Sequence, residues 1–286
     1  MKDEAAKKAL VIGFPVAHAR SPLIHGFWLE TLGLPGAYER AEVKPGEVST
    51  FLRALPANGY AGANITVPHK EEAFRTCDYL TDRARAAGAV NTVWFENGAL
   101  WGDNTDGLGF VSHLNQTYPD RKKAAKVLIL GAGGAARGLI LPLVESGASS
   151  VTVTNRSHPR AEALVQDMKT ARPDAIISTA AWEDRAAALA QADLIINTTS
   201  LGMKGQPPLE IDLGGAKPDT IVADIVYVPL ETAFLAQARA RGLRTLDGLG
   251  MLLHQAVPGF EHWFGTKPEV TPALRAHLVA DIEKKA

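Results

Sequence analysis

The sequence has little of several features that would define a specialised class of protein. Its 286 residues include a single cysteine, Cys77, so an intrachain disulfide is impossible and a reducing compartment, the cytoplasm, is expected. Neither charge is in excess, with 30 Lys and Arg residues against 31 Asp and Glu residues. Nucleic-acid-binding proteins normally show a basic excess or a basic stripe, so we expect no nucleic-acid partner.

Long apolar runs and several catalytic signatures are also missing. The apolar run near the start of the chain ends at Gly13, too short for a signal peptide or a membrane span, and we expect no membrane partner. The eight histidines have no metal-ligand spacing, so no metal site is expected. The absence of a G-x-S-x-G elbow and of a P-loop argues against acyl transfer and phosphoryl transfer.

The sequence does contain short apolar strands that alternate with helices, a pattern typical of α/β proteins. Strands are expected at residues 10–13, 38–43, 62–66, 89–95 and 99–101, the last two as a hairpin around Asn97 and Gly98. Helices are expected over residues 45–55, from Pro68, and from Ser21, with Ser21 as its N-cap. We therefore predict a first domain with a mostly parallel sheet.

A second α/β half begins near Lys126. Its strands are expected at residues 127–130, 151–154, 175–178, 194–197, 221–224 and 244–246, in a doubly wound, Rossmann-type pattern. The helical tail after Leu249 has no strand of its own, and we expect it to return to the first domain. The predicted domains are therefore residues 1–106 plus 250–286, and residues 107–249.

A glycine-rich turn in the second half matches the dinucleotide fingerprint G-x-G-x-x-A. Gly131, Gly133, Gly134 and Ala135 follow an apolar strand and open a helix, with Ala136 as the small residue of the motif. The glycines permit a tight turn and close approach to a pyrophosphate, and the helix start offers free N–H groups. These residues are predicted to bind a dinucleotide.

The end of the next strand indicates which dinucleotide binds. Sites for NAD usually have an acidic residue there, whereas this chain has Asn155, Arg156 and Ser157, followed by Arg160. Arg156 can stack on the adenine and hold a 2′-phosphate, and Arg160 can add a second charge. The predicted cofactor is NADP(H), and the second half is predicted to be its binding domain.

Polar residues in the first half point to a binding site for a small molecule. Ser21 begins a helix, which suits a carboxylate as well as a simple cap. Asn64 and Thr66 alternate along a strand end and so point to the same side.

Three further polar residues have the same two interpretations. Lys70 falls in the first turn of a helix, where the macrodipole disfavours a cation, and it is either a solvated lysine or a functional one. Asn91 interrupts an apolar strand, and Asp106 ends a polar turn before a helix. A solvent-facing amide and a helix cap remain the structural alternatives for these two.

Taken in order along nearly the whole chain, these segments resemble the shikimate dehydrogenase family. That family interconverts 3-dehydroshikimate and shikimate in chorismate and aromatic amino-acid biosynthesis. Further markers of the resemblance are Gly13, Pro15, Pro22, His25, Pro68, His69, Thr92, Asn197, Gly202, Asp224, Pro229, Thr232, Asp247 and Gly250.

The resemblance implies roles for individual residues. It implies a catalytic pair of Lys70 and Asp106. It implies a substrate held through its hydroxyls by Asn64, Asn91, Asp106 and Gln255, and through its carboxylate by Ser21, Thr66 and Tyr227. It also implies cofactor contacts from Thr198 and Ser200, and from Met203, Gly248 and Met251 near the nicotinamide.

The implied activity is the reversible NADPH-dependent reduction of 3-dehydroshikimate, by a monomer or homodimer with a small-molecule substrate. Ala19 departs from the pattern, because the family usually has a serine there that binds the substrate carboxylate. Three alternatives are a quinate/shikimate dehydrogenase working oxidatively, often with NAD, a non-catalytic NADP-binding sensor, and a folate dehydrogenase of similar plan.

Overall fold

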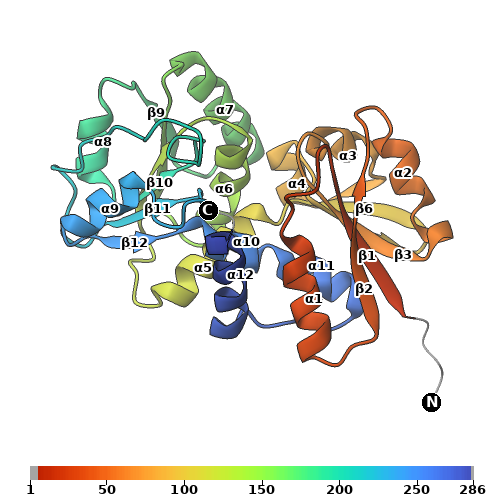
Figure 1. The fold of residues 1–286 in the computed structure, drawn as a ribbon. Helices are drawn as coiled ribbons and strands as arrows, with labels where there is room; N and C mark the ends of the chain where they lie inside the picture. Colours follow the sequence, from red (N-terminus) through yellow and green to blue (C-terminus); the bar gives the residue numbers. More distant parts are fainter. Residues whose placement is uncertain (1–5, 285–286) are drawn as a thin grey trace. The chain divides into compact units, whose positions relative to one another are not determined.

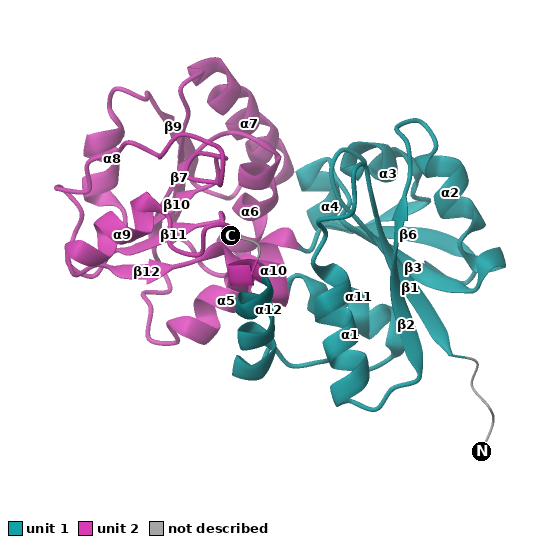
Figure 2. Cartoon of the chain, viewed as in Figure 1, with its two compact units in different colours: residues 1–105, 255–281 teal, residues 106–254, 282–286 magenta. Residues whose placement is uncertain are grey.

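The structure, a computed structural model, describes residues 6–284. Contacts divide the chain into two compact units, which Figure 2 colours separately. Unit 1 comprises Met1–Thr105 and Gln255–Asp281, and unit 2 comprises Asp106–His254 and Ile282–Ala286. Asp106 and residues 250–254 therefore group with unit 2, whereas the sequence-based division put them in the first domain.

Unit 1 is built on a six-stranded mixed sheet with the strand order β2-β1-β3-β5-β6-β4 (Figure 1). The strands are β1 (Lys7–Gly13), β2 (Gly36–Glu42), β3 (Tyr60–Ile65), β4 (Tyr79–Leu80), β5 (Thr92–Glu96) and β6 (Ala99–Asp103). β1 pairs in parallel with β2 and β3, and β5 runs antiparallel to β3 and β6. The expected hairpin is present, and Asn97 and Gly98 both have the positive φ that its turn requires.

Helices cover both faces of this sheet, and alternation along the strands explains how. Leu10 and Ile12 point into an apolar core with Val48, Leu52 and Ala84. The helices on that side are α2 (Val48–Ala54), α3 (Lys70–Thr76) and α4 (Asp82–Ala87). The opposite face carries α1 (Ser21–Thr31) and α11 (Ala256–Phe264), which contact β1. The return of the tail is therefore confirmed for α11.

Unit 2 contains a six-stranded sheet that is parallel throughout, with the order β12-β11-β10-β7-β8-β9. Its strands are β7 (Lys126–Leu130), β8 (Ser150–Thr154), β9 (Ile177–Ala180), β10 (Leu194–Asn197), β11 (Ile221–Asp224) and β12 (Arg244–Leu246). Counted from β7, the order is 6-5-4-1-2-3, the doubly wound Rossmann arrangement. The predicted α/β fold class is confirmed.

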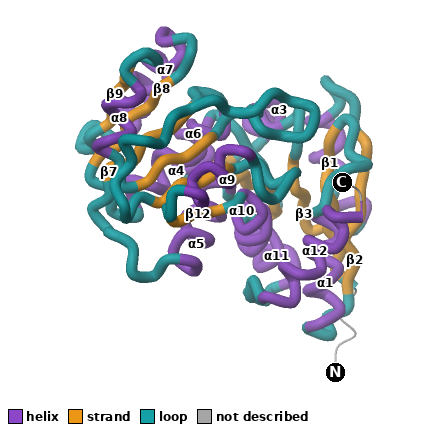
Figure 3. The backbone as a smooth tube through the Cα atoms, turned by 60° about the vertical axis from the view of Figure 1, so that its left-hand side comes forward, coloured by secondary structure: helices purple, strands orange, loops and turns teal. Residues whose placement is uncertain are grey.

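Helices accompany the strands of unit 2, and Figure 3 draws them in purple beside the orange strands. Those between strands are α6 (Gly134–Glu145), α7 (His158–Ala171), α8 (Arg185–Gln191) and α9 (Ala233–Ala240). α5 (Asp106–Thr117) precedes β7, α10 (Gly248–His254) follows β12, and α12 (Pro272–Lys284), most of it in unit 1, ends the described chain. α10 belongs to unit 2 because Gly250 lies directly against the ring of His113 in α5.

Several element boundaries differ from those expected. The helix expected from Pro68 begins at Lys70, and the helix expected over 45–55 spans Val48–Ala54. Ser21 is not the N-cap of α1. Arg20 holds that position without a side-chain hydrogen bond that caps the helix, and Ser21 is already the first helical residue. Pro22 thus sits in the first turn, where a missing N–H is tolerated.

Candidate active site

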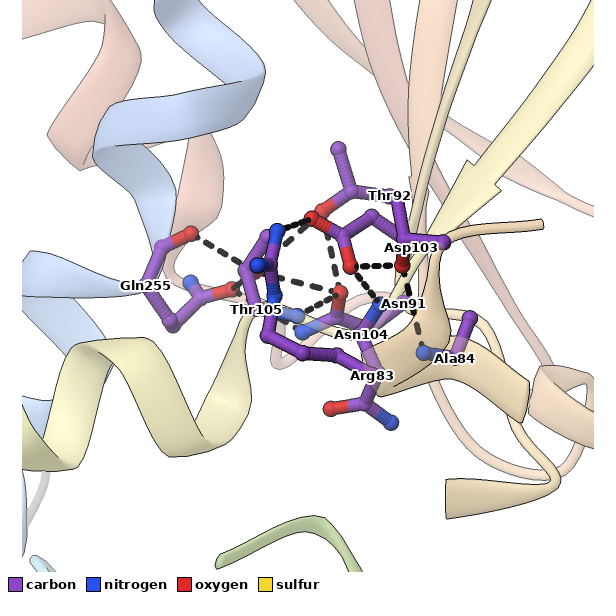
Figure 4. A network of polar contacts seen from close by, with 9 residues as sticks. Arg83, Ala84, Asn91, Thr92, Asp103, Asn104, Thr105 and Gln255 are labelled. Carbon is purple, nitrogen blue, oxygen red and sulfur yellow. Dashed lines mark hydrogen bonds and ion pairs between the residues drawn. The ribbon is translucent and has the colours of Figure 1, made fainter. Parts of the chain in front are cut away.

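Asn91 is the centre of a buried polar network in unit 1 (Figure 4). Its Oδ1 accepts hydrogen bonds from the Thr105 main-chain N (2.9 Å) and Oγ1 (3.1 Å), and from Thr92 Oγ1 (3.0 Å). Its Nδ2 donates to Gln255 Oε1 at 3.4 Å. The interpretation of Asn91 as a solvent-facing amide is therefore wrong, because its side chain joins segments more than 160 residues apart.

The segment that leads to Asp106 is fixed by this network and by a buried ion pair. Thr105 Oγ1 also lies 2.8 Å from the main-chain oxygen of Gln255, so its single proton is shared between this oxygen and Asn91 Oδ1. Asp103 is 3% exposed, and its carboxylate pairs with Arg83 at 2.7 Å and accepts from the Asn104 N–H at 2.7 Å. Asp106 follows Thr105 directly in the chain, so its backbone starts from a well-anchored point.

Asn64, on β3, has hydrogen bonds at both ends of its carboxamide. Its Oδ1 accepts from the Tyr38 hydroxyl at 2.6 Å and lies 3.3 Å from Nε2 of His25. Its Nδ2 donates to the Asn91 main-chain oxygen and to Thr92 Oγ1, both at 3.2 Å. Burial lowers the pKa of His25 to about 3, so this ring is neutral and its Nε2–H donates. The structure thus brings Asn64, Asn91 and Gln255 into one network.

Ser21 lies beside the same network. Its side chain is buried. Burial raises the pKa of Tyr38 well above its usual value, against the opposing effects of Ser21 and of the Arg40 charge. Tyr38 is therefore a neutral phenol, which donates to Asn64.

Thr66 and Lys70 are positioned by the chain between β3 and α3. The Thr66 N–H donates to the Ile12 oxygen at 2.9 Å, and a Cβ on Gly13 would lie 2.5 Å from Thr66 Cγ2, so a side chain there would displace Thr66. Lys70 is half-buried and is the first residue of α3. Its main-chain oxygen accepts from Val90 N–H at 2.9 Å, which places it next to the segment leading to Asn91.

The glycine turn of unit 2 has the geometry that a dinucleotide requires. Gly131 has a φ of +109°, and a Cβ there would lie 2.8 Å from Thr198 Oγ1. Gly133 and Gly134 have open space where a Cβ would be, and no side chain caps the start of α6. The first N–H groups of α6, which include that of Ala135, are thus available to a pyrophosphate, and these residues fit the group.

The arginines after β8 are exposed and have no acidic partner. Asn155 Nδ2 donates to the Ser157 oxygen at 2.9 Å, which closes a tight turn. Within residues 6–284, neither the Arg156 side chain nor the Arg160 side chain forms an ion pair or a hydrogen bond. Two uncompensated guanidinium groups at this strand end fit a 2′-phosphate.

Sequence reasoning missed the role of Asp224, the last residue of β11. This carboxylate is 1% exposed and accepts from Val226 N (3.0 Å), Thr232 Oγ1 (2.7 Å) and Asn197 Nδ2 (3.0 Å). Burial raises its pKa to about 6 against these bonds. An acidic residue ending an otherwise apolar strand was the available signal. Asp224 orders the loops that carry Thr198 and Tyr227.

The other predicted residues lie on those loops or on α10. Ser200 and Met203 follow β10 and are exposed, and Tyr227 follows β11 and is half-buried. Gly248 begins α10, and a Cβ there would lie 2.2 Å from the Ile225 oxygen, so glycine is required. Met251 is half-buried on α10.

Residues 6–284 lack two further features. No cluster of three or more His, Cys, Asp or Glu side chains is placed to hold a metal ion. No helix in that range combines the length and apolar character that crossing a bilayer requires.

The Rossmann sheet order and the open glycine turn place unit 2 in the class of dinucleotide-binding proteins. Three family models match the chain: "Shikimate dehydrogenase substrate binding domain" over residues 11–93, "Shikimate / quinate 5-dehydrogenase" over 113–203, and "Shikimate 5'-dehydrogenase C-terminal domain" over 248–276. The chain belongs to the shikimate dehydrogenase family.

Similar proteins agree with this assignment. The chain is 54% identical to a shikimate dehydrogenase (NADP(+)) of Methylobacterium radiotolerans, over 97% of this chain and 98% of that protein. Among solved structures, a quinate dehydrogenase from Corynebacterium glutamicum in complex with NAD has a TM-score of 0.88 at 30% identity, covering 96% of this chain and 99% of that one. A Thermus thermophilus shikimate 5-dehydrogenase in complex with NADP(H) and shikimate has a TM-score of 0.81 at 32% identity, covering 98% and 99%.

Proposed function

We propose that this chain is an NADP-dependent shikimate dehydrogenase that reversibly reduces 3-dehydroshikimate to shikimate in aromatic amino-acid biosynthesis. The observation that carries the proposal is the buried network of Asn64, Asn91 and Gln255, which gathers amide groups in unit 1. Amides both donate and accept hydrogen bonds, as the hydroxyls of a polyhydroxylated acid require. The relatives with this name support the proposal along nearly the whole chain.

The substrate is held by its polar groups. Its hydroxyls are bound by Asn64, Asn91, Asp106 and Gln255. Its carboxylate is bound by Ser21, Thr66 and Tyr227. Rigid positioning of this kind lowers the entropic part of the barrier.

Unit 2 binds the cofactor. The pyrophosphate is bound by Gly131, Gly133, Gly134 and Ala135. The 2′-phosphate is bound by Arg156 and Arg160, with Asn155 and Ser157 beside it. The rest of the cofactor site is lined by Thr198, Ser200, Met203, Gly248 and Met251. When bound, NADPH supplies the hydride that reduces the ketone carbon.

Lys70 and Asp106 form the acid–base pair. As negative charge develops on the ketone oxygen, the Lys70 ammonium stabilises it and donates the proton that completes the hydroxyl. Asp106 orients that ammonium and accepts from a substrate hydroxyl. In the oxidative direction, neutral Lys70 takes the proton from the substrate hydroxyl.

Initial rates of the purified chain test the proposal. With shikimate, NADP⁺ should be reduced to NADPH far faster than NAD⁺, and quinate should be the poorer substrate. Preference for quinate with NAD⁺ would favour the quinate dehydrogenase alternative, and NADP⁺ binding without turnover of either acid would favour the sensor.

We also propose that the enzyme acts in the cytoplasm as a monomer or homodimer. Its one cysteine is half-buried, and burial raises the pKa of that thiol to about 12. A thiol that stays protonated is a poor partner for disulfide exchange, which suits a protein whose fold uses no disulfide.

A further inference from the structure

Arg40 lies near the carboxyl end of β2, on the same sheet face as the candidate substrate site. In the register of the sheet, Arg40 pairs with Val11, and Val11 pairs with Asn64. Side chains alternate along strands, so Tyr38, Arg40 and Asn64 share one face. The bond from Tyr38 to Asn64 confirms that their side chains meet there.

The guanidinium of Arg40 reaches the loop just before Ser21. Its Nη2 and Nε donate to the main-chain oxygen of Ala19, at 2.8 and 3.3 Å. A guanidinium has five N–H donors, and these two bonds use two of them. The bonds to Ala19 fix the guanidinium beside the loop, two residues before Ser21, and its remaining donors lie there as well.

No acidic group neutralises Arg40. In the part of the chain that the structure describes, neither a salt bridge nor any further hydrogen bond of this side chain exists. Arg20, on the loop itself, pairs with Asp281 at 3.1 Å, and both side chains are largely buried. Arg40, which reaches this loop from β2, therefore keeps N–H donors open to an anion.

The Tyr38 hydroxyl, beside Ser21, is already engaged. It gives its single proton to Asn64 and has none left for a carboxylate. The free N–H groups of Arg40 have no competing acceptor, and Ala19 has no hydroxyl to offer.

We propose that Arg40 binds the carboxylate of the substrate and makes this site selective for an acid over its uncharged analogues. The inference rests on the proposed function and deepens it, because it assigns to Arg40 the contact that Ala19 does not supply. A guanidinium binds a planar carboxylate by charge-assisted hydrogen bonds.

The test compares shikimate with its uncharged methyl ester in Arg40→Ala and in the wild type. Removing a charge-assisted contact should raise KM and the binding constant Kd for shikimate about ten- to hundredfold, with little change in kcat. The values for the ester should stay the same. Arg40→Lys should fall between wild type and Arg40→Ala, because it keeps the charge and loses the planar fork.

Two further variants sharpen the comparison. Arg85→Ala removes another exposed unit 1 arginine, on α4, and should leave KM unchanged, which controls for net charge. Ala19→Ser should lower KM for shikimate more in the Arg40→Ala background than in the wild type, because the new hydroxyl then replaces a missing donor.

The possible failures are distinguishable. A wild type that oxidises shikimate while Arg40→Ala has unchanged KM and Kd overturns this inference alone. Equal losses for the acid and the ester show that Arg40 only shapes the Ala19 loop, and they also overturn it. A wild type that neither binds nor oxidises shikimate overturns the proposed function and the inference together.

Discussion

At the residue scale, Asp224 shows how a buried charge is kept in a loop framework. Three donors surround its carboxylate, yet burial dominates and its pKa rises from an ordinary 3.8 to about 6. The folded chain therefore binds this proton more tightly than the unfolded chain does. By linkage, the stability that this proton contributes is fully present below pH 4 and is lost as the pH rises to about 6.

Asp224→Asn should remove this pH dependence. The free energy of unfolding of the wild type should fall by about 2 kcal/mol, relative to the variant, between pH 4 and pH 7. Denaturant titrations at several pH values measure it. The variant also loses hydrogen-bond acceptors and should be less stable than the wild type at low pH. This constant difference does not affect how steeply the free energy of unfolding changes with pH. Parallel curves for the two proteins would contradict the assigned pKa.

Arg156 decides the choice of cofactor at the same scale. Because only NADP⁺ has a 2′-phosphate, Arg156→Ala should weaken NADP⁺ binding roughly ten- to hundredfold and leave NAD⁺ binding nearly unchanged. Isothermal titration with both dinucleotides measures this. Arg172→Ala, which removes a half-buried arginine paired with Asp174, serves as the control. Equal weakening of both cofactors would mean that Arg156 only stacks on the adenine.

Residue types at strand ends were readable from the sequence, but their partners were not. The glycine turn and the arginines after β8 stand where the motif predicted, because local backbone geometry sets them. The partners of Asn91 come from Thr105 and Gln255, and only the folded chain brings these residues together. Asp224 was missed for the same reason, since its contacts come from the end of β10 and from the segment between β11 and α9.

At the element scale, apolar strands were predicted better than helix starts. The runs at 194–197 and 221–224 coincide with β10 and β11, because four buried residues leave a strand few alternatives. β4 is only Tyr79–Leu80 and has no periodicity to detect. The helix expected from Pro68 begins two residues later, at Lys70. His69 lies just before it, and its ring Nε2 is hydrogen-bonded to the Val43 main-chain oxygen at 2.7 Å.

Two helical glycines should respond in opposite ways to alanine. A Cβ on Gly107 would lie 2.3 Å from the Gly138 oxygen and 2.5 Å from Pro142 Cγ, so Gly107→Ala must separate α5 from α6. Overpacking of this kind costs about 1–3 kcal/mol. Gly26, in α1, has open space around it, and Gly26→Ala should stabilise by about 0.5–1 kcal/mol.

Thermal or denaturant unfolding of both variants checks this pair. Since α1 carries Ser21 and is only made stiffer, Gly26→Ala should keep its activity. A Gly107→Ala protein as stable as the wild type would contradict the close packing of α5 on α6.

At the scale of the whole molecule, unit 1 is assembled from two distant parts of the chain. Trp263, on α11, is 1% exposed, and its Nε1 donates to the Val93 oxygen of β5 at 2.9 Å. Phe260 is also fully buried on the same helix. One face of the unit 1 sheet therefore depends on residues that follow unit 2 in the sequence.

A chain that ends after His254 should consequently lose one function and keep the other. Without α11, its sheet face is exposed and Gln255 is gone, so shikimate binding should be abolished, while NADP⁺ binding to unit 2 should persist. Titration calorimetry with each ligand measures both. A chain ending after Thr271 retains α11 and should bind shikimate better than the shorter one. Undiminished shikimate binding by the shorter chain would contradict this dependence.

The central claim is that this chain oxidises shikimate with NADP⁺ through Lys70. The most direct measurement is kcat for that reaction in the wild type and in Lys70→Ala, side by side, with KM determined for each. The wild type should turn over, and the variant should lose at least about a hundredfold in kcat with little change in KM, as expected for a lost acid–base group. A variant that keeps most of the wild-type kcat would contradict the account.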